Sequence, residues 1–485
     1  MNKMNMISAS RRLQAALLAV LISTAPALAQ QTGSVLVRDA TLLTVTNGTL
    51  AETDILIEDG RITQIGQDLR RPRGVDEVDA TGKFVMPGIV DAHAHIALSS
   101  INESTSPVTA EVSMEDVTNP YHLGIYRALA GGVTTSHTMH GSANVIGGQN
   151  ETIKHRWGET DPDAIRFEGA PRTIKFALGE NPTRVHGNRG SGGSDSIVPR
   201  SRMGVEQVLR NAFENGQRYL AAWSRYENEV RTNPRAVPPV YDERLEAMAD
   251  ILRGEILVHC HSYRADEILM LLRVLDDYGV DRITFQHANE GFKVAPELAE
   301  YGAGASVFSD WWSYKFEVYY STAYNAAILL RNGVVTSINS DSGELNRHLY
   351  HEAAKSQRYG ALTDDETLSL ITINPALQLG IADRVGSLEV GKDGDIVIFD
   401  GHPLSVYAVP EQTYVDGVKY FDRFEDVDDM RLRVDPSEEP GTYREQETGA
   451  HAGHVGEIRS FEDLFGGLHF EDADSAIEDR QGSNR

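Results

Sequence analysis

Two histidines separated by one residue follow an apolar stretch, in Pro87-Gly88-Ile89-Val90-Asp91-Ala92-His93-Ala94-His95. Side chains at positions i and i+2 of a strand share one face. If this stretch is a strand, His93 and His95 point into the same space. Two imidazoles so placed can bind one divalent cation.

Three later segments also place metal-binding residue types at the ends of predicted strands. His259 and His261 end the run Ile256-Leu257-Val258-His259-Cys260-His261, His287 ends Ile283-Thr284-Phe285-Gln286-His287, and Asp341 follows Val334 to Ser340. Each residue alone has an ordinary structural explanation, such as a hydrogen-bonded histidine or an aspartate that caps a helix. Together, in chain order, they predict a metal site.

The elements that position these residues alternate between strand-like and helical patterns. The runs 256–259 and 282–287 predict strands, and 265–278 and 295–300 predict helices. About 290 residues of such alternation fit a parallel (β/α)8 barrel, whose active sites lie at the carboxyl ends of the strands. We therefore predict a barrel over residues 87–378.

Short strand signals flank the barrel on both sides. On the N-terminal side, Asp59-Gly60 joins two apolar runs and predicts a hairpin. A similar strand-rich stretch returns around 386–399 and 414–417. Because neither stretch can bury a core alone, we predict one small β-sandwich built from 30–86 and 379–420.

The combination of motifs resembles the metal-dependent amidohydrolase superfamily, and within it the imidazolonepropionase-like and Xaa-Pro-dipeptidase-like branch. The motifs that carry the resemblance are the segments 87–95, 131–135, 145–149, 177–182, 372–376 and 386–395, together with His259, His287 and Asp341. The resemblance covers about residues 33 to 420. It implies an α/β fold, namely a (β/α)8 barrel with a split β-sandwich, and one or two divalent metals, usually zinc.

The resemblance also implies individual roles. His93, His95 and Asp341 would bind a buried metal, and His259 with His287 a more exposed one. Relatives with two metals use a bridging carboxylate, often a carboxylated lysine at the end of the fourth strand.

Two residues compete for that bridging position. In Thr173 to Leu178 the bulky apolar side chains share one parity, which leaves Lys175 facing the barrel interior. Glu180 lies where the strand should have ended, and a loop could still turn it toward the metals. Strand alternation favours Lys175 over Glu180, and an ordinary ion pair of Lys175 stays an alternative.

The predicted chemistry is hydrolysis by metal-activated hydroxide. A bound divalent cation lowers the pKa of water from 15.7 toward ~7. Asp341 would act as general base toward the attacking water and then as general acid toward the leaving amine. Among the four residues of Val258-His259-Cys260-His261, the resemblance favours His259 as the ligand and leaves His261 for the substrate.

Several residues near the predicted metal site are candidates for contact with the substrate. His140 follows a predicted strand, and Gly147-Gly148 suits close backbone approach to a ligand. Arg184 and Arg202 flank the Gly/Ser-rich stretch 190–196 and could pair with a substrate carboxylate. Solvated surface arginines are the alternative.

Composition excludes other partners. The chain has 485 residues with 45 Lys+Arg against 71 Asp+Glu, a net charge of −26. No basic cluster suited to nucleic acid is present in the sequence. The single cysteine, Cys260, rules out a disulfide within the chain.

The two ends of the chain have their own patterns. Basic residues, an apolar run and Ala27-Leu28-Ala29 predict a signal peptide over 1–29 and hence export to the periplasm or medium. Its apolar run is about ten residues, too short for a bilayer that needs ~20. Residues 421–485 carry 18 Asp+Glu and 7 Arg, which predicts a mostly disordered acidic tail.

We therefore predict an exported metal-dependent hydrolase of carbon–nitrogen amide bonds, acting on dipeptides or N-acyl amino acids. A lactonase or deaminase with the same metals is one alternative. A degenerate barrel that only binds a metal or ligand is another, and the complete set of metal-binding residues argues against it. The partner is a small amide or peptide, with no nucleic acid and no stable membrane insertion after cleavage. Homo-oligomerisation stays open.

Overall fold

A computed structural model describes residues 31–187, 199–312 and 314–425. The predicted signal peptide, the Gly/Ser-rich stretch 190–196 and the tail from 426 onward lie outside these described residues. Within them, no helix combines the length and the apolar character that crossing a bilayer requires.

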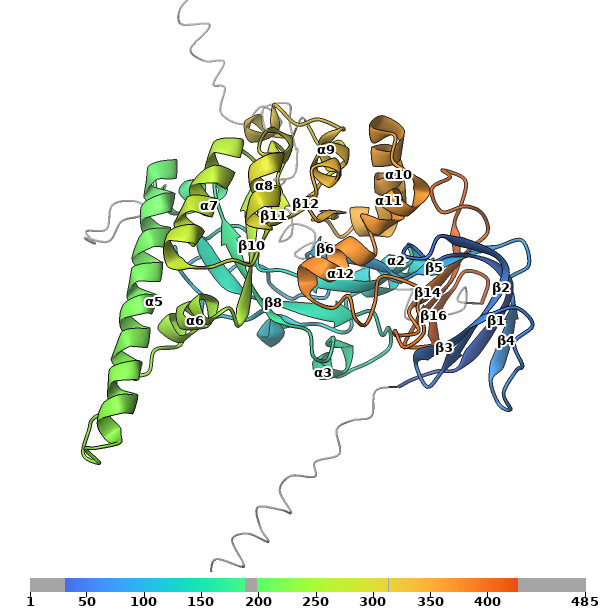
Figure 1. Cartoon of the computed structure of the whole chain (residues 1–485), viewed down its shortest axis with the longest axis horizontal. Coiled ribbons are helices and arrows are strands. Elements are labelled where there is room, and N and C mark those ends of the chain that lie inside the picture. Colours follow the sequence, from blue (N-terminus) through green and yellow to red (C-terminus); the bar gives the residue numbers. More distant parts are fainter. Residues whose placement is uncertain (1–30, 188–198, 313, 426–485) are drawn as a thin grey trace, which may run out of the picture. The chain divides into compact units, whose positions relative to one another are not determined.

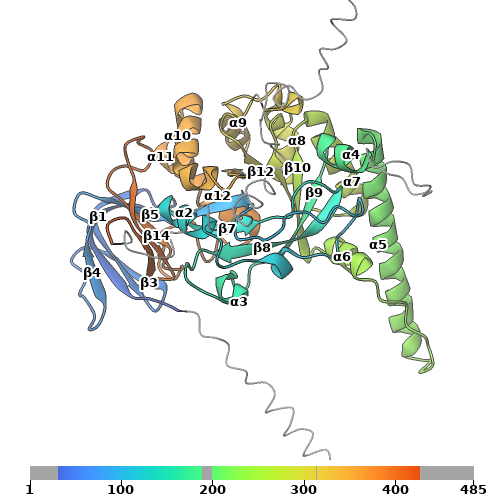
Figure 2. The ribbon, with the colours of Figure 1, turned by 180° about the vertical axis from the view of Figure 1, so that it is seen from behind.

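The first sheet is assembled from both ends of the chain. Its strand order is β16-β15-β14-β5-β1-β2-β3, with β4 paired to β1. Figures 1 and 2 show the N-terminal and C-terminal strands side by side, and β5 pairs with β14 in antiparallel register. The strands are β1 Val35–Leu43, β2 Thr49–Glu58, β3 Arg61–Gly66, β4 Asp76–Asp79, β5 Phe84–Pro87, β14 Ile396–Phe399, β15 Pro410–Val415 and β16 Val418–Asp422.

The predicted hairpin joins β2 and β3. Asp59 and Gly60 have φ values of 50° and 81°, the left-handed pair that a tight hairpin turn needs. At the other end of the sheet, β16 runs to Asp422, two residues beyond the predicted end at 420.

The second sheet is the barrel, with strand order β13-β12-β11-β10-β9-β8-β7-β6. The backbone N–H of Asp341, just after β13, donates to the carbonyl of His93 in β6 at 2.9 Å, which brings the two edges together. The predicted fold class, an α/β barrel with a small β-sandwich built from both ends of the chain, is confirmed, and the strands predicted for the sandwich form the first sheet. The strands are β6 Ile89–Ala94, β7 Val133–Thr138, β8 Ile146–Lys154, β9 Arg172–Ala177, β10 Ile256–Ser262, β11 Ile283–His287, β12 Gly304–Val307 and β13 Thr336–Ile338.

The barrel departs from eight parallel strands at one position. β8 runs antiparallel to both β7 and β9. Only residues 139–145 separate β7 from β8, and a parallel crossover needs a dozen residues or more, usually a helix. The short connection therefore reverses the chain direction at the third strand.

Helices cover the barrel. The predicted helices at 265–278 and 295–300 are α7 Ala265–Tyr278 and α8 Ala295–Tyr301. The longest, α5, extends past α6 in Figures 1 and 2. The remaining helices are α2 Gly124–Ala130, α3 Pro162–Ile165, α4 Glu180–Gly187, α5 Arg202–Val230, α6 Glu243–Arg253, α9 Asn325–Arg331, α10 Leu349–Gly360, α11 Asp364–Ser369 and α12 Ile373–Leu379, with short 3-10 turns η1 Met114–Val117, η2 Gly291–Lys293, η3 Phe316–Val318 and η4 Leu345–His348.

The side chains of β9 alternate between the outer face of the barrel, which the helices cover, and the barrel interior. Ile174 and Phe176 join the apolar core outside the barrel, where the ring of Phe176 lies 6.1 Å from that of Phe213 on α5. Lys175 between them must therefore point inward.

Candidate metal centre

Three residues from opposite edges of the barrel sheet meet at the carboxyl end of β6. The Nε2 atoms of His93 and His95 lie 3.1 and 3.0 Å from Oδ1 of Asp341, and 3.3 Å from each other. All three side chains are buried. The His-x-His pair and Asp341 therefore converge on one point; the shared face was predicted for the two histidines, and the resemblance added Asp341.

His287 completes the cluster through an unusual backbone conformation. Its Nε2 lies 3.7 Å from Oδ2 of Asp341, and His93, His287 and Asp341 form a group able to hold an ion. His287 and Asp341 have φ values of 68° and 47°, a left-handed region that residues other than glycine seldom adopt. Such backbone strain clusters at functional sites, where it aims side chains.

Lys175 joins the histidines and Glu180 does not. Nζ of Lys175 is fully buried and lies 2.9 Å from Nε2 of His93. Glu180 begins α4, and its carboxylate is partly exposed and lies 3.8 Å from Nζ of Lys315. The alternative of Glu180 as the bridging ligand is therefore not supported by the geometry.

The two histidines of β10 occupy different positions. His259 is in register with Lys175, and its ring lies 4.6 Å from that of His137. The ring of His261 lies 4.7 Å from that of His287. Both face the cluster from β10, and the choice of His259 as the ligand stays a prediction.

The donor set fits a divalent cation of the zinc type. Nδ1 of His95 lies 2.9 Å from the carbonyl of Met139, so it carries the proton and leaves the Nε2 lone pair directed at the cluster. Nε2 of the Gln286 side-chain amide lies 3.0 Å from Nδ1 of His259 and holds the ring in place, and no group in the described part of the chain hydrogen-bonds to the buried Nε2 of His259. Neutral imidazoles and a carboxylate are typical zinc donors.

Burial sets the protonation of these groups. Desolvation holds the pKa of His93 well below its usual value, which keeps the imidazole neutral. Desolvation also lowers the pKa of Lys175 to about 8. An amine with this pKa is partly neutral near pH 7 to 8, and a neutral amine is nucleophilic.

Asp91 is a positioning residue that the sequence did not reveal. Its carboxylate accepts hydrogen bonds from the backbone N–H groups of His93 at 3.1 Å and Ser340 at 3.2 Å, and from the hydroxyl of Ser340 at 2.5 Å. It therefore joins β6 to the segment that carries Asp341. Asp91 lies inside the histidine motif, but its partner Ser340 is 249 residues away in the chain.

The prediction that His140 contacts substrate is not supported by its contacts. Its Nε2 accepts from the N–H of Glu103, and its Nδ1 lies 2.9 Å from the carbonyl of Gly141. A Cβ at Gly147 or Gly148 would lie 2.7 or 3.0 Å from this ring. The two glycines make room for His140 and not for a ligand.

Arg202 also differs from its predicted role. It forms ion pairs with Glu267, at 2.6 Å, and with Glu317. Its charge is therefore balanced within the protein and is not available for a substrate carboxylate. Arg184 is exposed on α4.

The pairs of Arg202 belong to a network at the rim. Nζ of Lys315 donates to Oδ1 of Asn181 at 3.0 Å and lies 3.5 Å from Glu317 and 4.2 Å from the ring centroid of Tyr263. Burial raises the pKa of Glu267 to about 7. The network links α4, α5, α7 and the segment after β12, which fixes the rim around the cluster.

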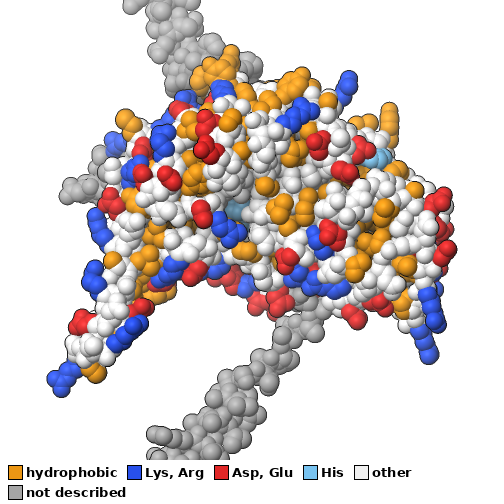
Figure 3. Space-filling model, in the orientation of Figure 1, with side chains coloured by type: hydrophobic (Ala, Val, Ile, Leu, Met, Phe, Trp, Pro, Cys, Tyr) orange, Lys and Arg blue, Asp and Glu red, His pale blue; other side chains and the backbone are white. Residues whose placement is uncertain are grey.

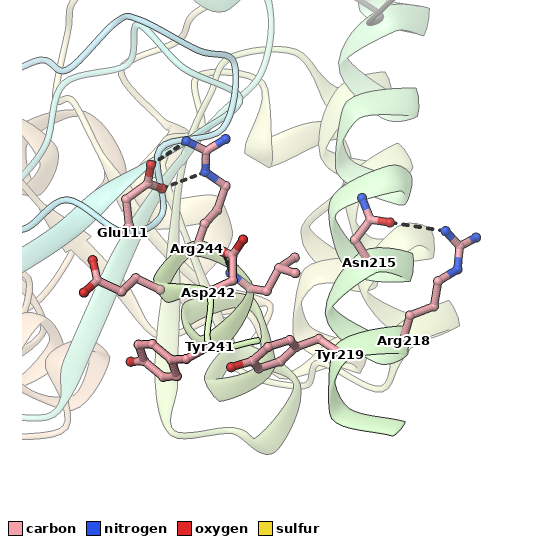
Figure 4. A pocket seen from close by; sticks show the side chains of 9 residues that line it. Glu111, Asn215, Arg218, Tyr219, Tyr241, Asp242 and Arg244 are labelled. Carbon is pink, nitrogen blue, oxygen red and sulfur yellow. Dashed lines mark hydrogen bonds and ion pairs between the residues drawn. The ribbon is translucent and has the colours of Figure 1, made fainter. Parts of the chain in front are cut away.

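A large pocket lies elsewhere. It has a volume of about 910 Å³ and lies between α5 and the start of α6 (Figure 4). Tyr219 and Tyr241 line it, and Arg244 pairs with Glu111 at its edge at 2.8 Å. None of its lining residues belongs to the histidine cluster.

Comparisons with known proteins agree with this geometry. The sequence profile described as "Amidohydrolase family" matches residues 84–420. The chain is 32% identical over 398 residues to the amidohydrolase tasK of Hapsidospora irregularis, which covers 76% of this chain and 40% of that protein. It is 24% identical to the imidazolonepropionase of Thermoplasma acidophilum, over 75% of this chain and 85% of that enzyme.

A solved structure shows the same fold. An amidohydrolase from Thermotoga maritima MSB8 superposes with a TM-score of 0.73 and 33% identity, covering 80% of this chain and all of that one. The matched residues include every member of the histidine cluster. This chain belongs to the amidohydrolase family and is a metal-dependent hydrolase of carbon–nitrogen bonds.

Proposed function

We propose that this protein is an exported zinc hydrolase that cleaves the amide bond of dipeptides or N-acyl amino acids. The observation that carries the proposal is the convergence of three imidazoles on Asp341, with Lys175 2.9 Å from His93. The site lies at the carboxyl ends of the barrel strands, where barrel enzymes act.

Two groups of residues would hold the ions. His93, His95 and Asp341 would bind one, and His259 and His287 the other, with Lys175 between them as a carbamate. Support for the carbamate comes from the pKa of Lys175, which burial lowers to about 8. The resulting neutral amine can add to carbon dioxide and release a proton.

Asp341 would move the proton. A bound divalent cation supplies Lewis-acid activation of water and of the scissile carbonyl. The carboxylate of Asp341 takes the proton of the attacking water and delivers it to the leaving amine. Asp91 keeps Asp341 in position through Ser340, because both partners of that contact are buried.

The test combines metal analysis with a substrate library. The washed protein is analysed for divalent ions and then incubated with mixed dipeptides and N-acyl amino acids, with products identified by mass spectrometry. We expect bound zinc and free amino acid products. Asp341→Asn should remove nearly all turnover, whereas Asp276→Asn, on the exposed face of α7, should leave it unchanged.

Other outcomes would redirect the proposal. Ammonia release without amino acid products would identify a deaminase, and turnover of lactones alone would identify a lactonase. No bound ion, and no activity after addition of zinc, manganese or cobalt, would overturn the assignment of an enzyme. Export is tested separately by expressing the full chain and determining the N-terminus of the mature protein, which we expect to be Gln30.

A further inference from the structure

A row of stacked rings leads away from the histidine cluster. The ring of Phe308, directly after β12, lies 4.7 Å from that of His287 at an angle of 19°. Trp311 stacks on Phe308 at 4.4 Å and 13°. Tyr263 also stacks on His287, at 5.3 Å, and accepts a hydrogen bond from the hydroxyl of Tyr314 at 2.9 Å. The wall of the site on this side is therefore aromatic.

The same segment continues to the surface with further aromatic side chains. In η3, Val318 is buried in a cluster with Tyr263 and Phe308, and Glu317 is buried as well, while the aromatic side chains on either side of these two residues are exposed. We call the exposed residues the aromatic rim: Trp312, Phe316, Tyr319 and Tyr320, which are 46%, 84%, 68% and 60% exposed. Figure 3 shows hydrophobic side chains gathered along the upper edge, above α8 and α9 of Figure 1.

Contacts hold the rim side chains together. Phe316 stacks on Tyr319 at 6.0 Å, and Tyr319 meets Tyr320 edge-on at 5.1 Å. Nζ of Lys293 lies 4.0 Å from the centroid of Tyr320. Beneath the rim, Glu317 accepts a hydrogen bond from the N–H of Glu180 at 2.9 Å and pairs with Arg202, which fixes the backbone of η3.

The aromatic rim exposes four large aromatic side chains near one another in the chain. Single exposed apolar side chains are ordinary, but contiguous exposed aromatic patches mark binding surfaces. Folding does not require these rings, because Val318 and Glu317 already anchor η3. Aromatic faces bind flat or apolar groups strongly through burial and stacking.

We propose that the aromatic rim binds a bulky apolar group of the substrate, so that the enzyme prefers amides that carry an aromatic or long aliphatic side chain or acyl group. This inference rests on the proposed function. The rim and the ring pair Phe308 and Trp311 belong to one chain segment, and Phe308 stacks on His287 of the cluster. The aromatic surface is therefore continuous along this segment from the cluster to the rim. A group extending from the scissile bond would meet Phe308 and Trp311 first and the rim next.

The test compares matched substrates that differ only in one ring. N-acetylglycine is compared with N-phenylacetylglycine, and glycyl-alanine with glycyl-phenylalanine, so that the ring lies on either side of the scissile bond. We expect kcat/KM to be about tenfold or more higher for the ring-bearing member of at least one pair. In the variant Phe316→Ser/Tyr319→Ser/Tyr320→Ser, we expect that ratio to fall toward one.

The matched control removes exposed apolar side chains elsewhere. Val406→Ser/Tyr407→Ser changes residues that are 72% and 89% exposed between β14 and β15, and it should keep the ratio of the unaltered protein. A second readout does not need turnover. Calorimetry with the Asp341→Asn protein should show tighter binding of N-phenylacetylglycine than of N-acetylglycine, and the rim variant in the same background should lose this difference.

The outcomes separate the two proposals. If no amide is hydrolysed but the rim still discriminates the two ligands in calorimetry, the proposed function fails and the rim remains a ligand site. If amides are hydrolysed but the ratio is near one, or is unchanged in the rim variant, the rim proposal is overturned. A rim variant that only changes the oligomeric state in sedimentation would overturn it too, in favour of contact between copies of the chain.

Discussion

Replacing Lys154 by methionine should strongly destabilise the fold. Lys154 ends β8 and is fully buried, and its Nζ lies 2.6 Å from Asp393, 3.2 Å from Asp395 and 2.5 Å from Asp416. These aspartates belong to the C-terminal part of the first sheet and its approach. Lys154 therefore joins that sheet to the barrel.

The size of the stability loss in Lys154→Met depends on the ion pairs that the three aspartates would keep. Arg156 still pairs with Asp416, and Arg384 still pairs with Asp393, both at 2.7 Å. Asp395 would lose its ion pair with Lys154, and one of its buried oxygens has no hydrogen-bond partner among the described residues. Removing one partner of a buried ion pair costs about 3 to 5 kcal/mol of unfolding free energy.

The loss should depend on pH. Burial raises the pKa of Asp395 to about 6, above its unfolded value of 3.8, so the folded state binds its proton more tightly than the unfolded state. The stability from this group is present below the unfolded pKa and is lost as the pH rises through about 6. Without Lys154 the folded pKa rises further, and each unit adds about 1.4 kcal/mol to the cost at alkaline pH.

The assay is guanidinium unfolding at pH 5 and pH 8, followed by circular dichroism. The matched control is Lys83→Met, because Lys83 pairs with Glu411 in a partly exposed position and such pairs contribute about 0 to 1 kcal/mol. Lys154→Met/Asp395→Asn should regain part of the loss, since the amide carries no charge. A loss in Lys154→Met no larger than in the control, or equal at both pH values, would refute this reasoning.

Three further predictions concern the metal centre and its surroundings. Asp91→Ala should weaken zinc binding by about 10- to 100-fold, because the backbone N–H groups of His93 and Ser340 lose their acceptor. Competition with a chelator measures this affinity, and Asp76→Ala, at an exposed position, is the control that should leave it unchanged. Lys175→Ala should lower the metal content by one ion per chain and remove the carbamate signal in ¹³C NMR after labelling with bicarbonate, and an unchanged ion count would contradict its bridging role. Gly147→Ala should cost about 1 to 3 kcal/mol of unfolding free energy, because the added Cβ would lie 2.7 Å from the ring of His140. The control Gly66→Ala should leave the unfolding free energy nearly unchanged, because its Cβ would lie 3.5 Å from Leu69, an ordinary contact distance.

Much of the site could be predicted because strand geometry is local. The period of two placed His93 and His95 on one face, and the same period turned Lys175 inward between Ile174 and Phe176. The motifs shared with amidohydrolases predicted the barrel, the second sheet and the metal ligands before any contact was known. The inward direction of Lys175 needed only its two apolar neighbours.

The alternation of side chains between the two faces of a strand does not predict the direction of His287, because the backbone leaves the regular strand conformation there. Gln286 points inward toward His259, so a regular strand would send His287 outward. The positive φ of His287 turns its ring back to Asp341. A backbone conformation of this kind is stabilised by the surrounding fold and leaves no repeat in the sequence.

The sequence by itself determined which side chains share a face, since that depends only on covalent geometry and burial of apolar neighbours. The tertiary structure decided which distant groups meet. Asp91 reaches Ser340, Arg202 pairs with Glu267 and Glu317, and the two glycines of β8 accommodate His140. Such pairings depend on strand register and on the relative placement of loops, and these follow from the packing of the whole barrel.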